Sequence, residues 1–216
     1  MKKKTSVEAL KKGLTSKEGV TAMSIANTYD SYATQVLVGQ GFITEAPRTG
    51  KKKRYRLALS GVLPSHEDYG SVRDELYTYS ITALLDDGYS QIAELQGEVQ
   101  EIVDNASEGL SATQRIQTLS ETADTLSNME AVSVPPEVEA LNLKAVFLPS
   151  LSTRTGRSER FSEAVRNLET AVSALERWEH ENGKDHPSFE AVDEFLGEIQ
   201  EHIDEASGVE FPGMFG

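Results

Sequence analysis

The feature that most constrains the fold is a repeating apolar seam in the last two thirds of the chain. Apolar residues recur there at alternating steps of three and four, the spacing of a helix face that packs along another helix. The seam residues are Ile92, Leu95, Val99, Ile102 and Ala106; Ile116, Leu119, Ala123 and Leu126; Phe161, Ala164, Leu168, Ala171, Leu175 and Trp178; and Phe189, Val192, Leu196, Ile199 and Ile203. They predict an all-α bundle or coiled-coil region that self-associates, although one chain can also pair these helices internally.

The first sixty residues have a different pattern, in which short apolar runs alternate with turn signals. Helices are expected at residues 5–13, at about 15–23 and at about 27–40, the second opened by a capping box of Thr15 and Glu18. Strands are expected at 42–46 and 51–59, with a turn at 47–50 between them. Residues 60–64 break this pattern. The predicted domains are therefore 1–60, 61–209 and an apolar tail at 210–216.

The charge is divided between the same two regions. Residues 1–60 hold twelve Lys/Arg and four Asp/Glu, a net charge of +8, whereas residues 61–216 hold nine and thirty-one, a net charge of −22. Such a split suggests that the basic region meets an anion and that the acidic region does not. The alternative is a soluble acidic protein with a lysine-tipped loop.

The densest basic run lies in the expected turn and second strand. It consists of Arg48, Lys51, Lys52, Lys53, Arg54 and Arg56. Six positive charges on one hairpin can neutralise DNA phosphates and gain from counterion release. The alternative is a solvated hairpin tip that is kept charged to block edge-to-edge pairing.

Three motifs in residues 5–59 carry a family resemblance. They are Thr15-Ser16-Lys17-Glu18 before the second helix, Gly41-Phe42-Ile43 after the third, and Arg48-Thr49-Gly50-Lys51-Lys52-Lys53-Arg54-Tyr55-Arg56-Leu57 as a hairpin. In this order they resemble the winged helix-turn-helix superfamily. The resemblance implies a mostly α fold with three helices and a β-hairpin wing, a double-stranded DNA partner and, most commonly, transcription regulation. Asp30 departs from the family's usual apolar residue near the start of the recognition helix.

Five polar residues are expected on the outer face of the third helix, away from its apolar stripe. They are Asn27, Thr28, Ser31, Thr34 and Gln35. Asn and Gln side chains can bond adenine edges in the major groove, so these residues are candidates for base contacts. They are equally compatible with an ordinary solvent-exposed face.

The end of the chain is an apolar segment after an acidic helix. Phe211, Met214 and Phe215 are its large side chains. Such a segment can dock in a partner's groove or on a neighbouring subunit, and this prediction is preferred. The alternative is that it folds back on its own bundle.

Several classes of chemistry lack the residues that they need. The chain has no cysteine, which excludes disulfides, Cys-ligated zinc, iron–sulfur clusters and thiol catalysis. It has no phosphate-cradling glycine loop, nucleophile elbow or HExxH motif, and its four histidines lack metal-ligand spacing. We therefore expect no enzyme activity, cofactor or metal. No apolar run is long enough to span a membrane, and no secretory signal is recognisable.

Two hypotheses about function follow. The first is a cytoplasmic DNA-binding regulator that uses the winged unit and dimerises or oligomerises through its helical region. The second is a structural or assembly protein, for example a viral DNA-packaging or virion component. In that case the winged unit, the acidic helical region or the tail would make protein contacts. A regulator is expected to be a dimer, whereas an assembly component is expected to form larger rings or to depend on another protein.

Overall fold

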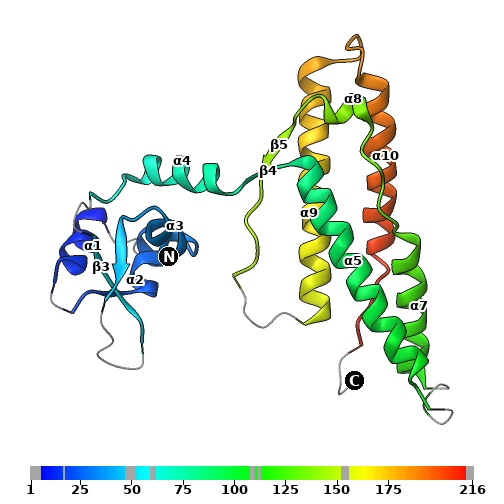
Figure 1. Cartoon of the computed structure of the whole chain (residues 1–216), viewed down its shortest axis with the longest axis horizontal. Helices are drawn as coiled ribbons and strands as arrows, with labels where there is room; N and C mark the ends of the chain where they lie inside the picture. The colour runs from blue at the N-terminus through cyan, green and yellow to red at the C-terminus, as the bar shows by residue number, and fades with distance from the viewer. Residues whose placement is uncertain are drawn as a thin grey trace. The chain divides into compact units, whose positions relative to one another are not determined.

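The chain is mostly helical, with small antiparallel sheets (Figure 1). The computed structural model describes residues 6–16, 18–46, 52–58, 62–107, 110, 113–151 and 156–212. It divides into two units, Met1–Tyr77 (unit 1) and Thr78–Gly216 (unit 2), each of which is described by itself. The division lies beyond residues 60–64, where the sequence pattern breaks. Counted over these units, the net charge is +5 for unit 1 and −19 for unit 2.

Unit 1 combines short helices with a three-stranded sheet. Its elements are α1 (Val7–Leu14), β1 (Val20–Thr21), α2 (Ala22–Thr28), α3 (Ala33–Gly39), β2 (Ile43–Glu45), β3 (Arg54–Leu57) and α4 (His66–Leu76). The sheet is antiparallel with strand order β1-β3-β2. Its register pairs Val20 with Tyr55 and Ile43 with Leu57. The hairpin of β2 and β3 therefore agrees with the strands expected from the sequence.

The expected second helix at 15–23 is wrong. The hydroxyl groups of Thr15 and Ser16 donate to carbonyls of α1, at 3.0 Å from Lys12 O and 2.7 Å from Gly13 O, so they close the first helix. Gly19 then turns the chain with φ +66°, and a Cβ there would clash with the Tyr55 carbonyl oxygen. The next helix begins after Thr21, whose Oγ1 accepts from the Ser24 amide. Residues 24–26, which separate the second and third expected helices, therefore lie inside α2.

The expected third helix at 27–40 is two helices separated by a turn. Asp30 Oδ1 accepts a hydrogen bond from the Tyr32 amide at 2.8 Å. A short acidic side chain that bonds the backbone two residues ahead competes with helical bonding, so the helix breaks there. The expected end of the third helix near residue 40 is confirmed. Gly41 has φ +72°, and the Phe42 amide bonds the Leu37 carbonyl oxygen.

The core of unit 1 includes α4, which the sequence analysis had placed in the predicted helical domain at 61–209. Ile25, Leu37 and Ile43 are fully buried at its centre. Leu63, which precedes α4, and Tyr69, which belongs to it, are buried in the same cluster. The segment after the hairpin is therefore an integral part of unit 1.

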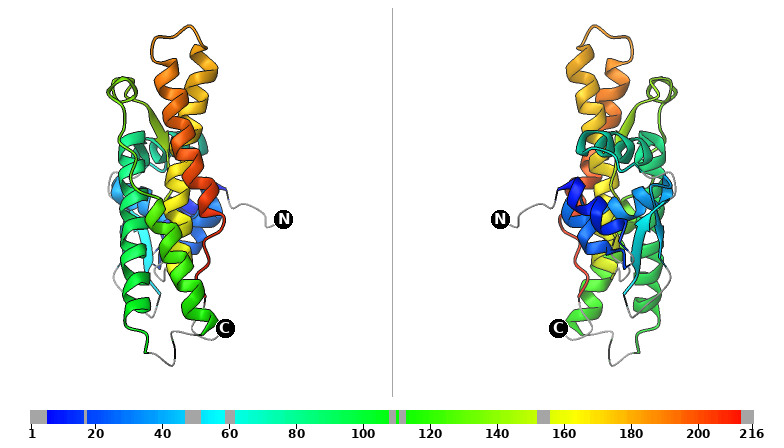
Figure 2. Two further views of the ribbon diagram at one scale, coloured as in Figure 1. Left: turned by 90° about the vertical axis from the view of Figure 1, so that its right-hand side faces the viewer. Right: turned by 90° about the vertical axis from the view of Figure 1, so that its left-hand side faces the viewer.

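In its described residues, unit 2 consists mainly of long helices, with a small sheet of β4 and β5. Its elements are β4 (Thr78–Ser80), α5 (Ile81–Asp104), α7 (Gln114–Asn128), α8 (Pro136–Glu139), β5 (Lys144–Val146), α9 (Arg157–Asn182) and α10 (Phe189–Ala206). Helices α5, α7, α9 and α10 run alongside one another (Figure 2). Strands β4 and β5 pair antiparallel, so the expectation of an all-α region is wrong at this place.

The apolar seams of unit 2 pack against one another within the single chain. Leu95 of α5, Leu168 of α9 and Ile199 of α10 have no exposed surface. Helices α5 and α9 approach closely at Gly88, where a Cβ would lie 2.9 Å from Leu168 Cδ2. The structure thus corresponds to internal pairing, the alternative to self-association through these faces. Self-association stays a prediction, but it needs a surface other than these seams.

Membrane insertion finds no support in the described helices. None of them combines the length and the apolar character that crossing a bilayer requires.

Candidate nucleic-acid interface

The basic hairpin of unit 1 presents its charges unequally. Lys52 and Lys53 are exposed before β3 begins, whereas Arg54 and Arg56 are half-buried within the strand. Tyr55 lies between these arginines and points into the core. Arg48, Lys51 and the turn at 47–50 lie outside the described residues. The two lysines are therefore the described hairpin cations with the best access to a phosphate.

The arginines of β3 also brace the sheet. Arg54 Nη1 donates to the Gly19 carbonyl oxygen at 3.2 Å, which ties β3 to the turn before β1. Arg56 packs its Cγ against Gly19, at 3.2 Å from where a Cβ would lie. Because glycine leaves room for this side chain, Gly19 serves both the turn and the base of the hairpin.

An ion pair crosses the hairpin between Lys53 Nζ and Glu45 Oε2, which are 3.2 Å apart. The side chains are 55% and 42% exposed, so solvent and salt screen the attraction. Such surface pairs contribute about 0–1 kcal/mol. A phosphate can therefore replace Glu45 as the partner of Lys53 at little cost.

The five polar residues expected on one helix are distributed differently. Asn27 is exposed but lies on α2, not on α3. Thr28 is fully buried, and its Oγ1 donates to the Ser24 carbonyl oxygen at 3.1 Å. Its assignment as a DNA contact is therefore wrong, because the side chain is buried and bonded within α2. The break at Asp30 places Thr28 on α2 and not on α3.

Three of the five do come together at the start of α3. Ser31 and Gln35 are exposed and Thr34 is half-buried. Their spacing, continued by the exposed Val38, follows one face of a helix. Residues 20–41 contain no Lys or Arg. Among the described residues of unit 1, the exposed lysines are those of the hairpin and Lys11 and Lys12 of α1.

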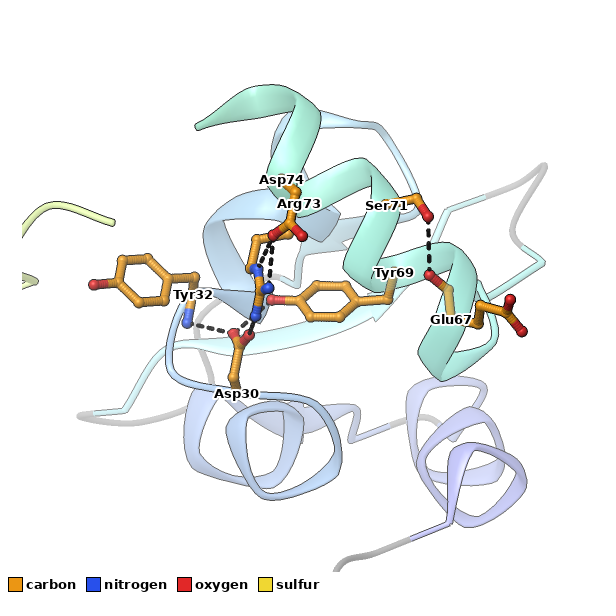
Figure 3. Close-up of polar contacts among 7 residues, drawn as sticks. All are labelled: Asp30, Tyr32, Glu67, Tyr69, Ser71, Arg73 and Asp74. Atoms are coloured by element: carbon orange, nitrogen blue, oxygen red, sulfur yellow. Dashed lines mark hydrogen bonds and ion pairs between the residues drawn. The ribbon is translucent and has the colours of Figure 1, made fainter. Parts of the chain in front are cut away.

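A polar cluster around Asp30 was not foreseen (Figure 3). Asp30 accepts from the Tyr32 amide, from the Tyr69 hydroxyl at 2.5 Å and from Arg73 Nη1 at 2.9 Å. Arg73 also donates to Asp74 Oδ1, from Nε at 2.8 Å and from Nη2 at 2.6 Å. The Asp30 carboxylate is thus matched by a guanidinium and two further donors.

The sequence held one weak signal for this cluster. Tyr69 and Arg73 are four residues apart on α4, so they share a helix face. Nothing local connects that face with Asp30, which lies 43 residues before Arg73. The pairing becomes visible only when α4 is placed on unit 1.

The tyrosines of this region remain hydrogen-bond donors. Burial raises the pKa of Tyr69, and its hydrogen bond to Asp30 raises it further. Burial, with a smaller contribution from Glu8, raises the pKa of Tyr29 to about 12. Both phenols are therefore protonated at neutral pH, and Tyr29 donates to the Pro64 carbonyl oxygen at 2.6 Å. That bond fixes the segment entering α4.

The C-terminal segment packs on its own bundle as far as the structure describes it. The Phe211 ring lies 5.6 Å from that of Phe161, centroid to centroid, and contacts the Val99 cluster. Thr122 Oγ1 donates to the Glu210 carbonyl oxygen at 2.6 Å. Docking of Phe211 on a partner, the preferred prediction, is therefore replaced by the alternative of folding back. Met214 and Phe215 lie outside the described residues.

Unit 2 has an acidic groove in its described part. A groove of about 660 Å³ beside α10 is lined by Glu137, Glu190, Glu194 and Glu198. Four carboxylates repel a phosphate backbone. Among the described residues, no three His, Asp or Glu side chains gather in a way that would hold a metal ion.

Comparisons with known proteins identify no relative. No family model, no curated protein and no solved structure matches this chain.

Proposed function

We propose that unit 1 is a winged-helix unit that binds double-stranded DNA. The observation that carries the proposal is topological. The order α1-β1-α2-α3-β2-β3 forms an antiparallel β1-β3-β2 sheet, and the hairpin that directly follows α3 exposes Lys52 and Lys53. A helix and an adjoining basic hairpin are the two elements with which a winged helix contacts a groove and its backbone.

Contacts to phosphates and contacts to base edges would contribute differently to binding. The hairpin lysines, with Lys11 and Lys12 of α1, would neutralise phosphates and supply most of the affinity. Ser31, Thr34 and Gln35 would face base edges, where polar side chains supply discrimination. Since α2 and α3 carry no Lys or Arg, affinity should depend on the hairpin more than on α3.

Unit 2 would act on binding through its charge. Its net charge of −19 opposes approach to DNA, and this repulsion extends over about 30 Å at 0.01 M salt. Regulation of transcription with self-association remains the use that we propose. Isolated apolar side chains such as Leu110 and Val146 are what the described part of unit 2 exposes for such contacts.

A salt titration of duplex DNA binding by the full chain tests the proposal. Replacing Lys52 and Lys53 with Glu should remove most affinity on any sequence. It should also reduce the log–log salt slope by about 0.9 for each phosphate that the variant no longer neutralises. The matched control replaces Lys144 and Lys184, which are exposed in unit 2, with Glu and changes the net charge equally.

The control should retain the wild-type slope. Equal losses in both double variants would mean that net charge, and not the hairpin, governs binding. The hairpin would then not be the DNA-binding site, and that part of the proposal would be wrong.

One observation favours the second candidate, an assembly protein whose unit 1 contacts protein. Helices α2 and α3 lack cations and expose Met23 and Val38, which are 73% and 42% accessible. Exposed apolar side chains without cations suit a protein partner better than a phosphate backbone. Light-scattering mass separates the candidates, since a regulator should be dimeric and an assembly component should form larger rings or need a second protein.

A further inference from the structure

The last residue of unit 1 contacts the polar face of α3. The Tyr77 hydroxyl donates to Gln35 Oε1 at 3.2 Å. The Tyr77 ring meets the Tyr32 ring edge-on, with centroids 5.5 Å apart and planes at 66°. Gln35 is the exposed side chain for which base contact was predicted, so this contact bears on recognition.

The Asp30 cluster anchors α4 (Figure 3), and Tyr77 is the residue that caps the end of this helix. Tyr69 and Arg73 both bond Asp30, which fixes the register of α4 against the start of α3. The Tyr77 amide bonds the Arg73 carbonyl oxygen at 3.1 Å, so Tyr77 continues the helical path by one turn. A side chain one turn after Arg73 lies on the same side of the helix and is directed to α3.

The hydrogen bond has a consequence for the orientation of the Gln35 carboxamide. A hydroxyl donor selects the amide oxygen, so the NH₂ group lies on the other side of the carboxamide. The bond to Tyr77 also reduces the rotamers open to Gln35 before any ligand arrives. A side chain that is already ordered loses less entropy when it binds.

We infer that Tyr77 is a positioning residue for base recognition, holding Gln35 so that its NH₂ group donates to a purine N7 in the major groove. This inference rests on the proposed DNA-binding function. Purine N7 is an acceptor that both adenine and guanine present in that groove. The second lone pair of Gln35 Oε1 stays available, which keeps a bidentate contact to adenine open.

The test uses the full chain and a pool of randomised duplex DNA. Bound sequences are read out, and the preferred duplex is then made with a 7-deazapurine at the position that requires a purine. Loss of N7 should weaken wild-type binding about fivefold, the effect of one hydrogen bond. Gln35→Ala should bind both duplexes equally.

Tyr77→Phe keeps the ring against Tyr32 and removes the hydroxyl. It should bind the preferred duplex about two- to tenfold more weakly than wild type, at an unchanged salt slope. In the Gln35→Ala background the same change should have no further effect, since its partner is gone. Tyr79→Phe, which removes a hydroxyl from unit 2, is the control and should bind as wild type does. Thermal unfolding of each variant checks that it folds.

Three outcomes would overturn the inference. Tyr77→Phe could discriminate as well as wild type, or better, which would make the contact neutral or obstructive. The Tyr77 effect could persist unchanged in Gln35→Ala, which would make it merely structural. The wild-type chain could bind the pool without sequence preference, in which case DNA binding stands and the inference falls. Absence of any binding would instead remove the proposed function itself.

Discussion

The contacts inside unit 1 differ in kind from the contacts inside unit 2. In unit 2, long helices bury continuous apolar faces, and the described core contains few polar side chains, such as Asn167, whose Nδ2 donates to Asp87 Oδ2 at 2.8 Å. In unit 1, α1, α2 and α3 are seven or eight residues long. Helices of this length are marginal alone, so they depend on tertiary contacts.

Some of those tertiary contacts come from α4 and from the segment that precedes it, and several of these are polar. Tyr69 and Arg73 bind Asp30, and Tyr29 binds the Pro64 carbonyl oxygen. Polar contacts are directional, so they fix an arrangement that a small apolar core alone would leave loose. Unit 1 should therefore be sensitive to single hydrogen-bonding groups, and unit 2 to the volume of its core.

The largest expected effect is on the folding of unit 1 without α4. A chain of residues 1–60 lacks Leu63 and Tyr69 from the core and leaves Asp30 without Arg73. We expect residues 1–77 to unfold cooperatively on heating and residues 1–60 to show no cooperative transition. Circular dichroism against temperature measures both. A cooperative transition at the same temperature in both chains would make α4 dispensable.

The next effect concerns the core of unit 2. Leu168 is fully buried where α9 crosses α5. Leu168→Ala should lower the free energy of unfolding of unit 2 by about 2–5 kcal/mol, because it removes buried apolar surface and leaves a cavity. Urea unfolding of the full chain measures this. Val146→Ala, at a residue that is 45% exposed, is the control and should cost far less.

A smaller effect is expected at the polar cluster of unit 1. Asp30→Ala removes the acceptor of three donors and should destabilise unit 1 by about 1–3 kcal/mol. Glu75→Ala, at an exposed position of α4, is the control. Hydrogen exchange of the α3 amides in the full chain reports the change. If protection in α3 were the same in both variants, the cluster would not hold α3 and α4 together.

The smallest expected effect is on the stability of unit 2 and comes from the ion pairs of Glu98. Glu98 accepts from Arg160 Nη2 at 2.7 Å and from Arg157 Nε at 3.2 Å, and these arginines hold its pKa below the ordinary value. A depressed carboxyl pKa stabilises the fold above the unfolded-state pKa, and this contribution is lost as pH falls through the folded-state pKa.

Because the Glu98 side chain is 39% exposed, solvent screening limits this contribution to less than about 1 kcal/mol. Glu98→Gln should therefore be slightly less stable than wild type at pH 7. The difference should disappear in acid, below the range in which a free glutamate titrates. A difference that grew as the pH fell would have the wrong sign.

The two units also differ in how much of their secondary structure and packing can be predicted from the sequence. The seams of unit 2 are periodic over many turns, so helices such as α9 are readable from spacing alone. Strands β4 and β5 have three residues each and pair across more than sixty residues, which leaves no local pattern to detect. The seams also could not distinguish internal pairing from self-association, because both bury the same face.

In unit 1 the predictable part is the hairpin, and the misplaced part is the helices. Thr15 and Glu18 match a capping box, yet the Thr15 hydroxyl closes α1. The break at Asp30 shifts the helix phase and buries Thr28, because the side chain bonds its own backbone in competition with the helix. The partners of Asp30 on α4 are distant in sequence. The cluster that orients α3 could therefore be recognised only from the three-dimensional structure.

We propose that unit 1 binds duplex DNA and that unit 2 does not. The most direct measurement is a salt titration of duplex binding by three chains: residues 1–77, residues 78–216 and the full chain. Residues 1–77 should bind, with affinity that falls as salt rises. The full chain should bind more weakly, with a gap that widens at low salt where unit 2's charge is least screened, and residues 78–216 should not bind. If residues 1–77 did not bind at about 50 mM salt, or if residues 78–216 did bind, DNA binding would not be a property of unit 1.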